Sequence, residues 1–366
     1  MSDKIRVLVV EDSMLFRTLL INNIRMDPEL EVIGFASDPF EARDKIIELR
    51  PDVMTLDIEL PKMSGLDFLK KLMPQFPVRT IVISSLSDKV FEALKAGAVD
   101  FLAKPVVSDR LQLEEFLKVE LPDKIKAASK AKLKIAPLPS ASKPTVSMNT
   151  GSVADIAYKT SGRNLKNVDE LIVAIGASTG GTEATAAVLS KYGPDMPGIV
   201  VTQHMPEGFT QMYANRLNNQ MGDRLTVTEA VHGEKILPAH VYIAPGGDRH
   251  MEVIRKGNGY YIQLVNKDKV NGHRPSVEVL FNSVAVAAGS NAVGIILTGM
   301  GGDGGKGLLN MRKSGARTIG QDESTCVVYG MPKVAYECGA VEFQEKLNDI
   351  PGRTYYLLES IQKKKE

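Results

Sequence analysis

The chain has 366 residues, of which 43% are hydrophobic and 24% charged, a composition typical of a soluble globular protein long enough for two domains. The net charge of +1 gives no general electrostatic case for nucleic-acid binding, and no run of about 18 apolar residues predicts a membrane span. The N-terminus lacks a signal peptide and two cysteines cannot staple a chain of this size, so we expect a cytoplasmic protein.

The first 120 residues alternate between strand-like and helical segments, which predicts an α/β domain with a doubly wound parallel sheet. The expected strands are residues 5–10, 32–36, 53–57, 80–84 and 100–103, and the expected helices are residues 14–25, 39–49, 65–73, 89–96 and 110–125. In such sheets ligands bind beyond the carboxyl ends of the strands, so the polar residues that close each strand are informative.

Five polar residues stand at these strand ends. Glu11 and Asp12 close the first strand, Asp57 the third, Ser84 the fourth and Lys104 the fifth. Acids of this kind suit Mg²⁺, and one of them can act as a nucleophile toward phosphorus while the lysine neutralises the transferring oxygens. The alternative is that these residues merely face water, which five matching positions make a poor explanation.

These residues, together with the LDIELPKMSG segment and the Lys-Pro pair at 104–105, resemble a response-regulator receiver domain with a flavodoxin-like fold over residues 3–122. The resemblance implies that Asp57 accepts a phosphoryl group from a histidine kinase. It also implies that Glu11, Asp12 and Asp57 hold Mg²⁺, that Ser84 is the switch hydroxyl, and that Lys104 contacts the phosphoryl group.

Residues 123–167 are rich in Pro, Ser and small residues and have no period, so we expect a flexible linker. From Lys124 to Lys166 the sequence has nine Lys or Arg residues and one acid, Asp155. A basic linker can touch an acidic partner, although solvation alone is the simpler interpretation.

The second half is organised around the segment LIVAIGASTGG. A buried strand at 171–175 leads into a glycine-rich turn with Ser178 at its apex, and a helix follows from Thr182. The G-x-S-x-G pattern is typical of a turn that exposes a nucleophilic serine. A dinucleotide-binding turn would need glycine in place of Ser178 and an acid after the next strand, where Gln203 and His204 stand. A plain structural turn is the third possibility.

Two other strand ends supply the remaining groups of a serine hydrolase. His204 closes the strand at 198–202, and Asp303 lies in the glycine-rich turn TGMGGDGGKG after another buried strand. We therefore expect a Ser178–His204–Asp303 triad at one rim, with His273 as the reserve histidine. The histidine spacing disfavours zinc, and the turn around Asp303 lacks the G-K-[ST] of a phosphate loop.

The segments GASTGG, QHMPEGF, NGHRPSVEVLF, ILTGMGGDGGKG and QDESTCVVYGMP resemble the catalytic domain of the CheB family of chemotaxis protein-glutamate methylesterases. The resemblance implies a Rossmann-like α/β/α esterase domain over residues 168–360, with Ser178 as nucleophile, His204 as base, Asp303 as orienting acid, and Thr179 and Met300 at the oxyanion site. It implies no cofactor for the esterase. It further implies methyl-accepting chemotaxis receptors as substrates, with demethylation of glutamates and deamidation of selected glutamines.

A two-domain transcription regulator is the rival interpretation, and residues 168–366 lack the helix-turn-helix pattern or basic recognition helix that it needs. A receiver followed by a flexible linker and an enzyme instead suggests control by docking. We expect the unphosphorylated receiver to pack beside Ser178 and to block a receptor helix until Asp57 is phosphorylated.

Overall fold

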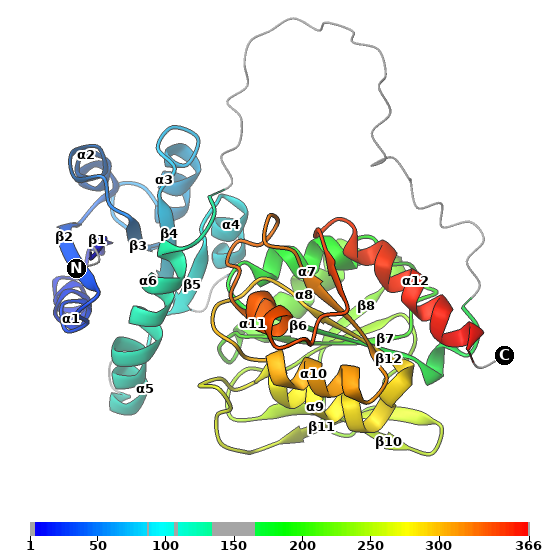
Figure 1. The fold of residues 1–366 in the computed structure, drawn as a ribbon. Coiled ribbons are helices and arrows are strands. Elements are labelled where there is room, and N and C mark those ends of the chain that lie inside the picture. The colour runs from blue at the N-terminus through cyan, green and yellow to red at the C-terminus, as the bar shows by residue number, and fades with distance from the viewer. Residues whose placement is uncertain (1–3, 86–87, 106–108, 134–164, 365–366) are drawn as a thin grey trace, which may run out of the picture.

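The computed structural model describes residues 4–85, 88–105, 109–133 and 165–364. Two α/β parts lie side by side, each built on its own parallel sheet, with five strands in the N-terminal part and seven in the C-terminal part (Figure 1). The expected fold class, two doubly wound parallel sheets, is confirmed. In the described residues no helix is long and apolar enough to cross a membrane.

The N-terminal sheet has the strand order β2-β1-β3-β4-β5, and every neighbouring pair is parallel. Its strands are β1 (Ile5–Val10), β2 (Leu30–Ala36), β3 (Val53–Asp57), β4 (Arg79–Ser84) and β5 (Asp100–Ala103). The first four helices are α1 (Met14–Ile24), α2 (Pro39–Leu49), α3 (Gly65–Leu72) and α4 (Lys89–Lys95). Alternate residues of β1 enter the two apolar layers, because successive side chains of a strand point to opposite faces.

The last helical run of this part differs from the expected single helix at 110–125. It consists of α5 (Arg110–Glu115), the π-helical turn η1 (Phe116–Glu120) and α6 (Leu121–Ser129). Pro122 has no N–H to donate to the preceding turn, so the wider π turn stands where a regular α-helical bond is unavailable. The helix also extends past residue 122, where we expected the linker to begin, because Ile125 and Ala128 pack into the apolar core. Residues 134–164, which make up most of the expected linker, lie outside the described residues.

The C-terminal sheet has the order β14-β13-β12-β6-β7-β9-β8 and is also parallel throughout. Its strands are β6 (Ile172–Ala177), β7 (Gly198–Gln203), β8 (Thr226–Glu229), β9 (His240–Ile243), β12 (Ala292–Ile296), β13 (Arg317–Gln321) and β14 (Phe343–Glu345). A hairpin is formed by β10 (His250–Lys256) and β11 (Gly259–Val265). The strands β12, β6 and β7 are adjacent at the centre, and their carboxyl ends meet at one rim.

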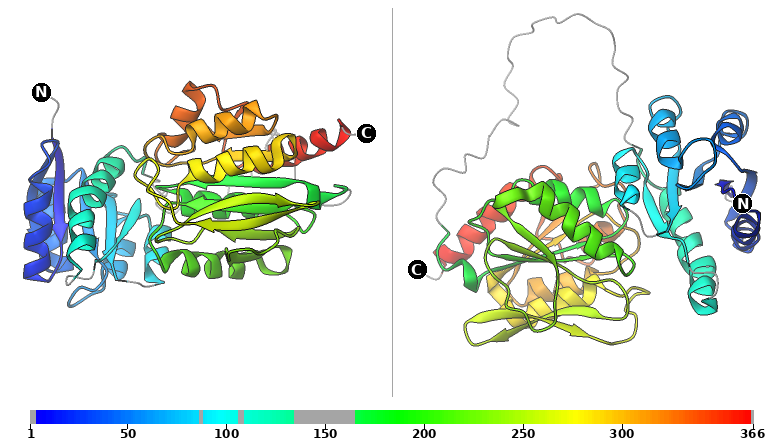
Figure 2. Two further views of the ribbon diagram at one scale, coloured as in Figure 1. Left: turned by 90° about the horizontal axis from the view of Figure 1, so that it is seen from below. Right: turned by 180° about the vertical axis from the view of Figure 1, so that it is seen from behind.

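Helices cover both faces of this sheet, as the views in Figure 2 show. One layer contains α7 (Gly181–Leu189), α8 (Phe209–Met221) and α12 (Ile350–Lys363). The other contains α9 (Val277–Ala288), α10 (Gly305–Lys313), α11 (Met331–Glu337) and the β10–β11 hairpin. Short 3-10 turns stand at Val168–Glu170, Gly222–Arg224 and Gly289–Asn291. Because β6 is covered on both sides, its residues are apolar or small throughout, which is the pattern of a buried parallel strand.

The two parts share an apolar interface. The ring of Phe91 in α4 stacks on Tyr213 in α8 at 5.9 Å, and Phe101 in β5 lies 5.0 Å from Phe209. On the other side of β5, Val328 joins the apolar cluster that contains η1 and α6. The edge strand β5 and its flanking helices therefore form the face that the N-terminal part turns toward the C-terminal part (Figure 1).

Candidate active site

Ser178 stands immediately after β6, at the rim of the larger sheet, and is 7% exposed. Its N–H donates to the Thr298 carbonyl at 3.0 Å, and its own carbonyl accepts from Gly181 N–H at 2.7 Å. Gly180 has φ 76°, a left-handed conformation that glycine adopts without strain, and α7 begins one residue later. A Cβ on Gly299 would lie 2.7 Å from Ser178 Cβ. These contacts hold the serine in a tight turn.

His204 and Asp303 reach the same rim from the two neighbouring strands. His204 Nε2 and Asp303 Oδ2 are 2.8 Å apart, and the two side chains are only 7% and 1% exposed. The His204 N–H donates to the Ala177 carbonyl at 3.1 Å, which fixes the histidine next to the serine turn. His204 Nδ1 is buried and has no hydrogen-bond partner within the described chain. The ring therefore keeps one nitrogen without a partner, and Ser178 Oγ makes no hydrogen bond to it.

The Asp303 carboxylate lies at the N-terminus of α9 and is surrounded by donors. Its Oδ1 accepts from Ser276 Oγ at 2.8 Å and from Asn271 Nδ2 at 2.9 Å, while Oδ2 also accepts from Val277 N–H at 2.7 Å. Burial raises the pKa of Asp303, but hydrogen bonds and the charge of His204 outweigh it and hold that pKa well below its usual range. The carboxylate stays ionised and can orient an imidazole.

Asn271 and Ser276 were not identified from the sequence. Ser276 accepts hydrogen bonds from Glu278 and Val279 N–H as the N-cap of α9, so a serine ahead of an apolar helical run was its only local signal. Nothing in the order of residues indicates that its hydroxyl proton points to Asp303.

Some backbone N–H groups near Ser178 donate a hydrogen bond within the protein and others do not. The Ser178 amide is engaged with Thr298, whose hydroxyl also accepts from Val328 N–H at 2.9 Å. Among the described residues, the amides of Thr179 and Met300 have no hydrogen-bond acceptor. Thr179 and Met300 follow the adjacent strands β6 and β12, so both amides lie in the turns on either side of Ser178.

His273, the reserve histidine, makes no hydrogen bond to Asp303 or to Ser178. Its ring instead stacks on the His204 ring, with 3.7 Å between centroids and 17° between planes. The geometry therefore favours His204 as the base and leaves His273 beside it.

A second cluster lies at the carboxyl ends of the smaller sheet. Glu11, Asp12 and Asp57 offer carboxylate oxygens that all lie within 4.8 Å of one another. Lys104 Nζ contacts Asp57 Oδ2 at 2.8 Å and Glu11 Oε2 at 3.0 Å. Burial and the nearby charge of Asp57 raise the pKa of Glu11 to about 7, because the two carboxylates lie close together and are shielded from water. Three oxygen-bearing acids with excess negative charge fit a hard cation such as Mg²⁺.

The Ser84 hydroxyl belongs to the same rim. Ser84 is 1% exposed, and its Oγ has no hydrogen-bond partner in the part of the chain that the structure describes. A buried hydroxyl without a partner has a strong tendency to bind an incoming acceptor. The five strand-end residues expected to converge do lie at this rim.

A buried hydrogen bond joins the serine turn to the amino end of β5, at the edge of the smaller sheet opposite the Asp57 rim. Thr179 Oγ1, next to the candidate nucleophile, donates to Asp100 Oδ2 of β5 at 2.6 Å. The same Asp100 oxygen pairs with Lys124 of α6, and Lys269 of the C-terminal part pairs with Glu115 of α5. The N-terminal part thus sits directly on the serine turn.

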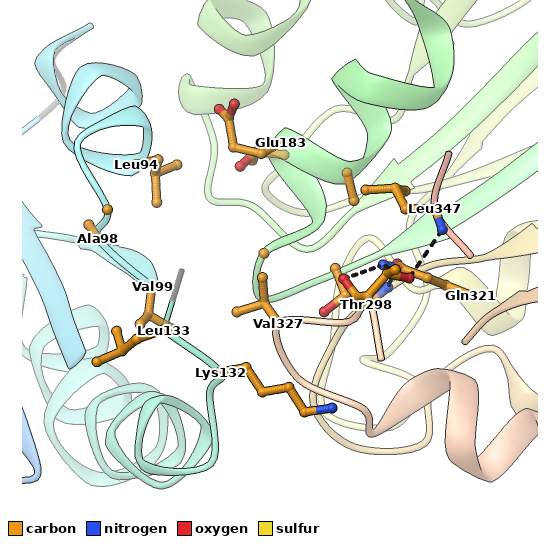
Figure 3. A pocket seen from close by; sticks show the side chains of 15 residues that line it. Leu94, Ala98, Val99, Lys132, Leu133, Glu183, Thr298, Gln321, Val327 and Leu347 are labelled. Carbon is orange, nitrogen blue, oxygen red and sulfur yellow. Dashed lines mark hydrogen bonds between the residues drawn. The ribbon is translucent and has the colours of Figure 1, made fainter. Parts of the chain in front are cut away.

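A pocket remains beside this contact. Leu94 and Val99 of the N-terminal part face Glu183 and Val327 of the C-terminal part across it (Figure 3). Lys132, which also lines the pocket, donates its backbone N–H to the Val327 carbonyl at 3.0 Å. Both parts line this pocket, so it exists only while they are docked.

Comparison with known proteins assigns both parts of the chain to families. Residues 173–354 match the CheB methylesterase family, and residues 7–114 match the response regulator receiver domain family. The protein-glutamate methylesterase/protein-glutamine glutaminase 2 of Syntrophomonas wolfei is 49% identical over 98% of this chain and 99% of its own length. The corresponding protein 1 of Geobacter metallireducens is 46% identical over 97% and 96%, and that of Methylobacillus flagellatus is 47% identical over 97% of each.

Proposed function

The chain belongs to the CheB methylesterase family and carries a receiver domain ahead of its catalytic part, and from this premise we propose that it hydrolyses glutamate γ-methyl esters on methyl-accepting chemotaxis receptors. Its relatives are named for both esterase and glutaminase activity, so we extend the proposal to deamidation of receptor glutamines. The observation that carries it is the 2.8 Å contact between His204 Nε2 and Asp303, which leaves His204 Nδ1 open beside the serine turn.

In the proposed reaction, Ser178 Oγ attacks the γ-carbonyl carbon while His204 Nδ1 takes the hydroxyl proton. Asp303 stabilises the imidazolium that forms and keeps its plane fixed. The open amides of Thr179 and Met300 donate to the oxyanion of the tetrahedral intermediate. The imidazolium returns its proton to the departing methoxide, methanol leaves, and water activated by His204 then cleaves the acyl-enzyme to glutamate. With a glutamine substrate the same acyl-enzyme forms and ammonia leaves.

The test is methanol release from methylated receptor by wild-type enzyme and by Ser178→Ala. The variant should fold normally and lose about 10⁴-fold or more of the rate, since it retains only binding and oxyanion stabilisation. A fluorophosphonate label should attach to the wild-type chain at Ser178 and not to the variant. A folded Ser178→Ala that releases methanol at a near-normal rate would remove the serine mechanism.

We assign residues 3–122, together with the rest of α6, to the receiver and residues 168–360 to the esterase. In the receiver, Asp57 is the phospho-acceptor for a chemotaxis histidine kinase, in the cytoplasm where the modified receptor helices lie. Glu11, Asp12 and Asp57 would hold Mg²⁺, which neutralises charge on the transferring phosphoryl group when bound. Lys104 contacts the acceptor carboxylate, and Ser84 supplies the buried hydroxyl that can approach the phosphoryl group.

Docking of the receiver on the serine turn is how we propose that phosphorylation controls the esterase. A receptor helix must reach Ser178, and β5 and α6 stand beside that turn through the Asp100–Thr179 contact. Lys104, which contacts Asp57, directly follows β5, whose first residue is Asp100. A change at Asp57 therefore needs to move only one short strand to loosen the contact with the esterase.

A further inference from the structure

The His204 ring has less polar support than its role requires. One side-chain hydrogen bond, from Nε2 to Asp303, holds it, and the opposite nitrogen Nδ1 has no partner among the described residues. A single bond along one axis leaves the ring able to tilt about that axis. A tilt would swing Nδ1 away from Ser178 Oγ, and general-base catalysis depends on that alignment.

The ring of His273 restrains the orientation of the His204 ring where hydrogen bonds do not. It lies parallel to His204 within 17°, with the centroids 3.7 Å apart. At this separation the two rings are in van der Waals contact over their faces, so a tilt of His204 collides with His273. The stacked ring blocks the motion that the Asp303 hydrogen bond permits.

His273 itself is held by a rigid loop. Val270 and His273 exchange backbone hydrogen bonds of 3.1 and 3.0 Å. Between them, Asn271 and Gly272 have φ values of 54° and 81°, as a tight two-residue turn requires. Arg274, the next residue, donates from its guanidinium to two backbone carbonyls at 3.1 and 3.0 Å. These contacts fix the backbone at His273, from which its ring reaches the face of His204.

The same loop also orients the acid. Asn271 Nδ2 and Ser276 Oγ, at its two ends, both donate to Asp303 Oδ1. One segment thus fixes the carboxylate through hydrogen bonds and the imidazole through stacking, so the two groups keep one mutual geometry.

The charge state of His273 allows its ring to stay stacked on His204 during the reaction. Burial, together with the nearby charge of His204, lowers the pKa of His273 to about 3, with Asp303 acting in the opposite direction and Lys124 and Lys269 in the same one. His273 is therefore neutral when His204 becomes an imidazolium. A neutral ring places no positive charge against His204 when His204 takes up the serine proton.

We propose that His273 is a positioning residue whose stacked face holds the His204 ring in line with Ser178. This inference rests on the proposed esterase function. It assigns to His273 neither proton transfer nor contact with the ester.

The test uses the full chain activated by a small-molecule phosphoryl donor with Mg²⁺, with methylated receptor as substrate. His273→Phe keeps an aromatic face and removes both nitrogens, whereas His273→Leu keeps apolar volume and removes the ring. The matched control is His240→Leu, which removes a histidine stacked on Tyr242 at 6.2 Å, at the opposite edge of the sheet where β9 begins. Ser178→Ala is run in parallel.

For His273→Leu we expect kcat to fall about tenfold, equivalent to about 1.4 kcal/mol of transition-state stabilisation, with KM within about twofold of wild type. His273→Phe should stay within about threefold of the wild-type kcat, and His240→Leu should match wild type. Where His273→Leu melts earlier than the control, His273→Gln replaces it, since its planar amide also lacks an aromatic face.

Wild-type kcat in His273→Leu or His273→Gln overturns the positioning role. An equal loss in His273→Phe and His273→Leu overturns it as well, because the nitrogens and not the face would then matter. Activity retained by Ser178→Ala would instead overturn the esterase mechanism, so the two failures are distinguishable.

Discussion

Replacing Asp100 with alanine tests whether the hydrogen bond between the two parts restrains the enzyme. Asp100 is 7% exposed and Thr179 is 1% exposed, and the carboxylate accepts the Thr179 hydroxyl at 2.6 Å. The substitution leaves that hydroxyl without its charged acceptor and removes the ion pair to Lys124. It leaves Ser178, His204 and the rest of the catalytic rim unchanged.

The magnitude follows from the chemistry of the contact. Hydrogen bonds to charged groups contribute about 1.5–3 kcal/mol, and each 1.4 kcal/mol is tenfold in an equilibrium constant, so the docked state should lose roughly 10- to 150-fold in population relative to the open state. The unphosphorylated Asp100→Ala chain should therefore release methanol about tenfold or more faster than wild type, up to the rate of the fully open enzyme. Asp100→Asn retains an acceptor oxygen without the charge, so its basal methanol release should lie between the rates of wild type and Asp100→Ala.

The assay is methanol release from methylated receptor, without a phosphoryl donor and then with donor and Mg²⁺. Asp27→Ala is the matched control, because Asp27 pairs with Lys126 of the same helix α6 at 3.0 Å but within the receiver. Asp100 Oδ1 also accepts from Phe101 N–H at 2.8 Å, so melting curves must show that the receiver stays folded. Basal activity of a folded Asp100→Ala equal to that of wild type, while the donor still activates it, would refute the restraint.

Three further outcomes follow from the same contacts. Asp303→Asn should lower methanol release by about 10⁴-fold without unfolding the chain, because His204 loses the carboxylate that fixes its tautomer; a loss smaller than tenfold would contradict this. Asp57→Asn should abolish the response to donor and Mg²⁺ while basal methanol release stays at the wild-type level, and a preserved response would place phosphorylation elsewhere. The buried His273 has its pKa lowered from 6.5 to about 3, so below pH 6.5 the unfolded chain binds a proton that the folded chain does not. The free energy of unfolding should then fall by up to about 1.4 kcal/mol per pH unit on acidification, and His273→Phe should flatten that slope between pH 7 and 5 in urea titrations; identical slopes would contradict it.

Most of the residues that sequence reasoning located lie at or just after the end of a strand that the hydrophobic pattern reveals, whereas Asp303 lies in a turn beyond the end of β12. Asp57 at the end of β3, Ser178 after β6 and His204 after β7 could be placed at a rim because parallel strands bring their carboxyl ends together. The alternation of strands and helices predicts parallel strands whose carboxyl ends share one edge, whereas the strand order is known from the structure.

The contacts that the sequence did not predict join segments that are far apart in the chain and that no hydrophobic periodicity relates. The Asp100–Thr179 bond spans 79 positions, and its donor and acceptor meet only because two separate cores pack together. The stacking of His273 on His204 depends on the turn at Asn271, whose partner Asp303 lies 32 positions away. The π turn near Pro122 occurs where the proline has no N–H for a helical hydrogen bond. The spacing of apolar residues carries no information about such a missing bond.

The position of β5 at the edge of the smaller sheet has a consequence for how the molecule behaves once its parts separate. Edge strands carry unpaired N–H and C=O groups and readily recruit another chain, and here the neighbouring surface also holds the rings of Phe91 and Phe101. In the docked arrangement that face is turned toward the larger part and its rings are covered. If phosphorylation separates the two parts, it exposes this edge and these rings at the same time as it opens the serine turn. Any association with other proteins through this face would then depend on the phosphorylation of Asp57.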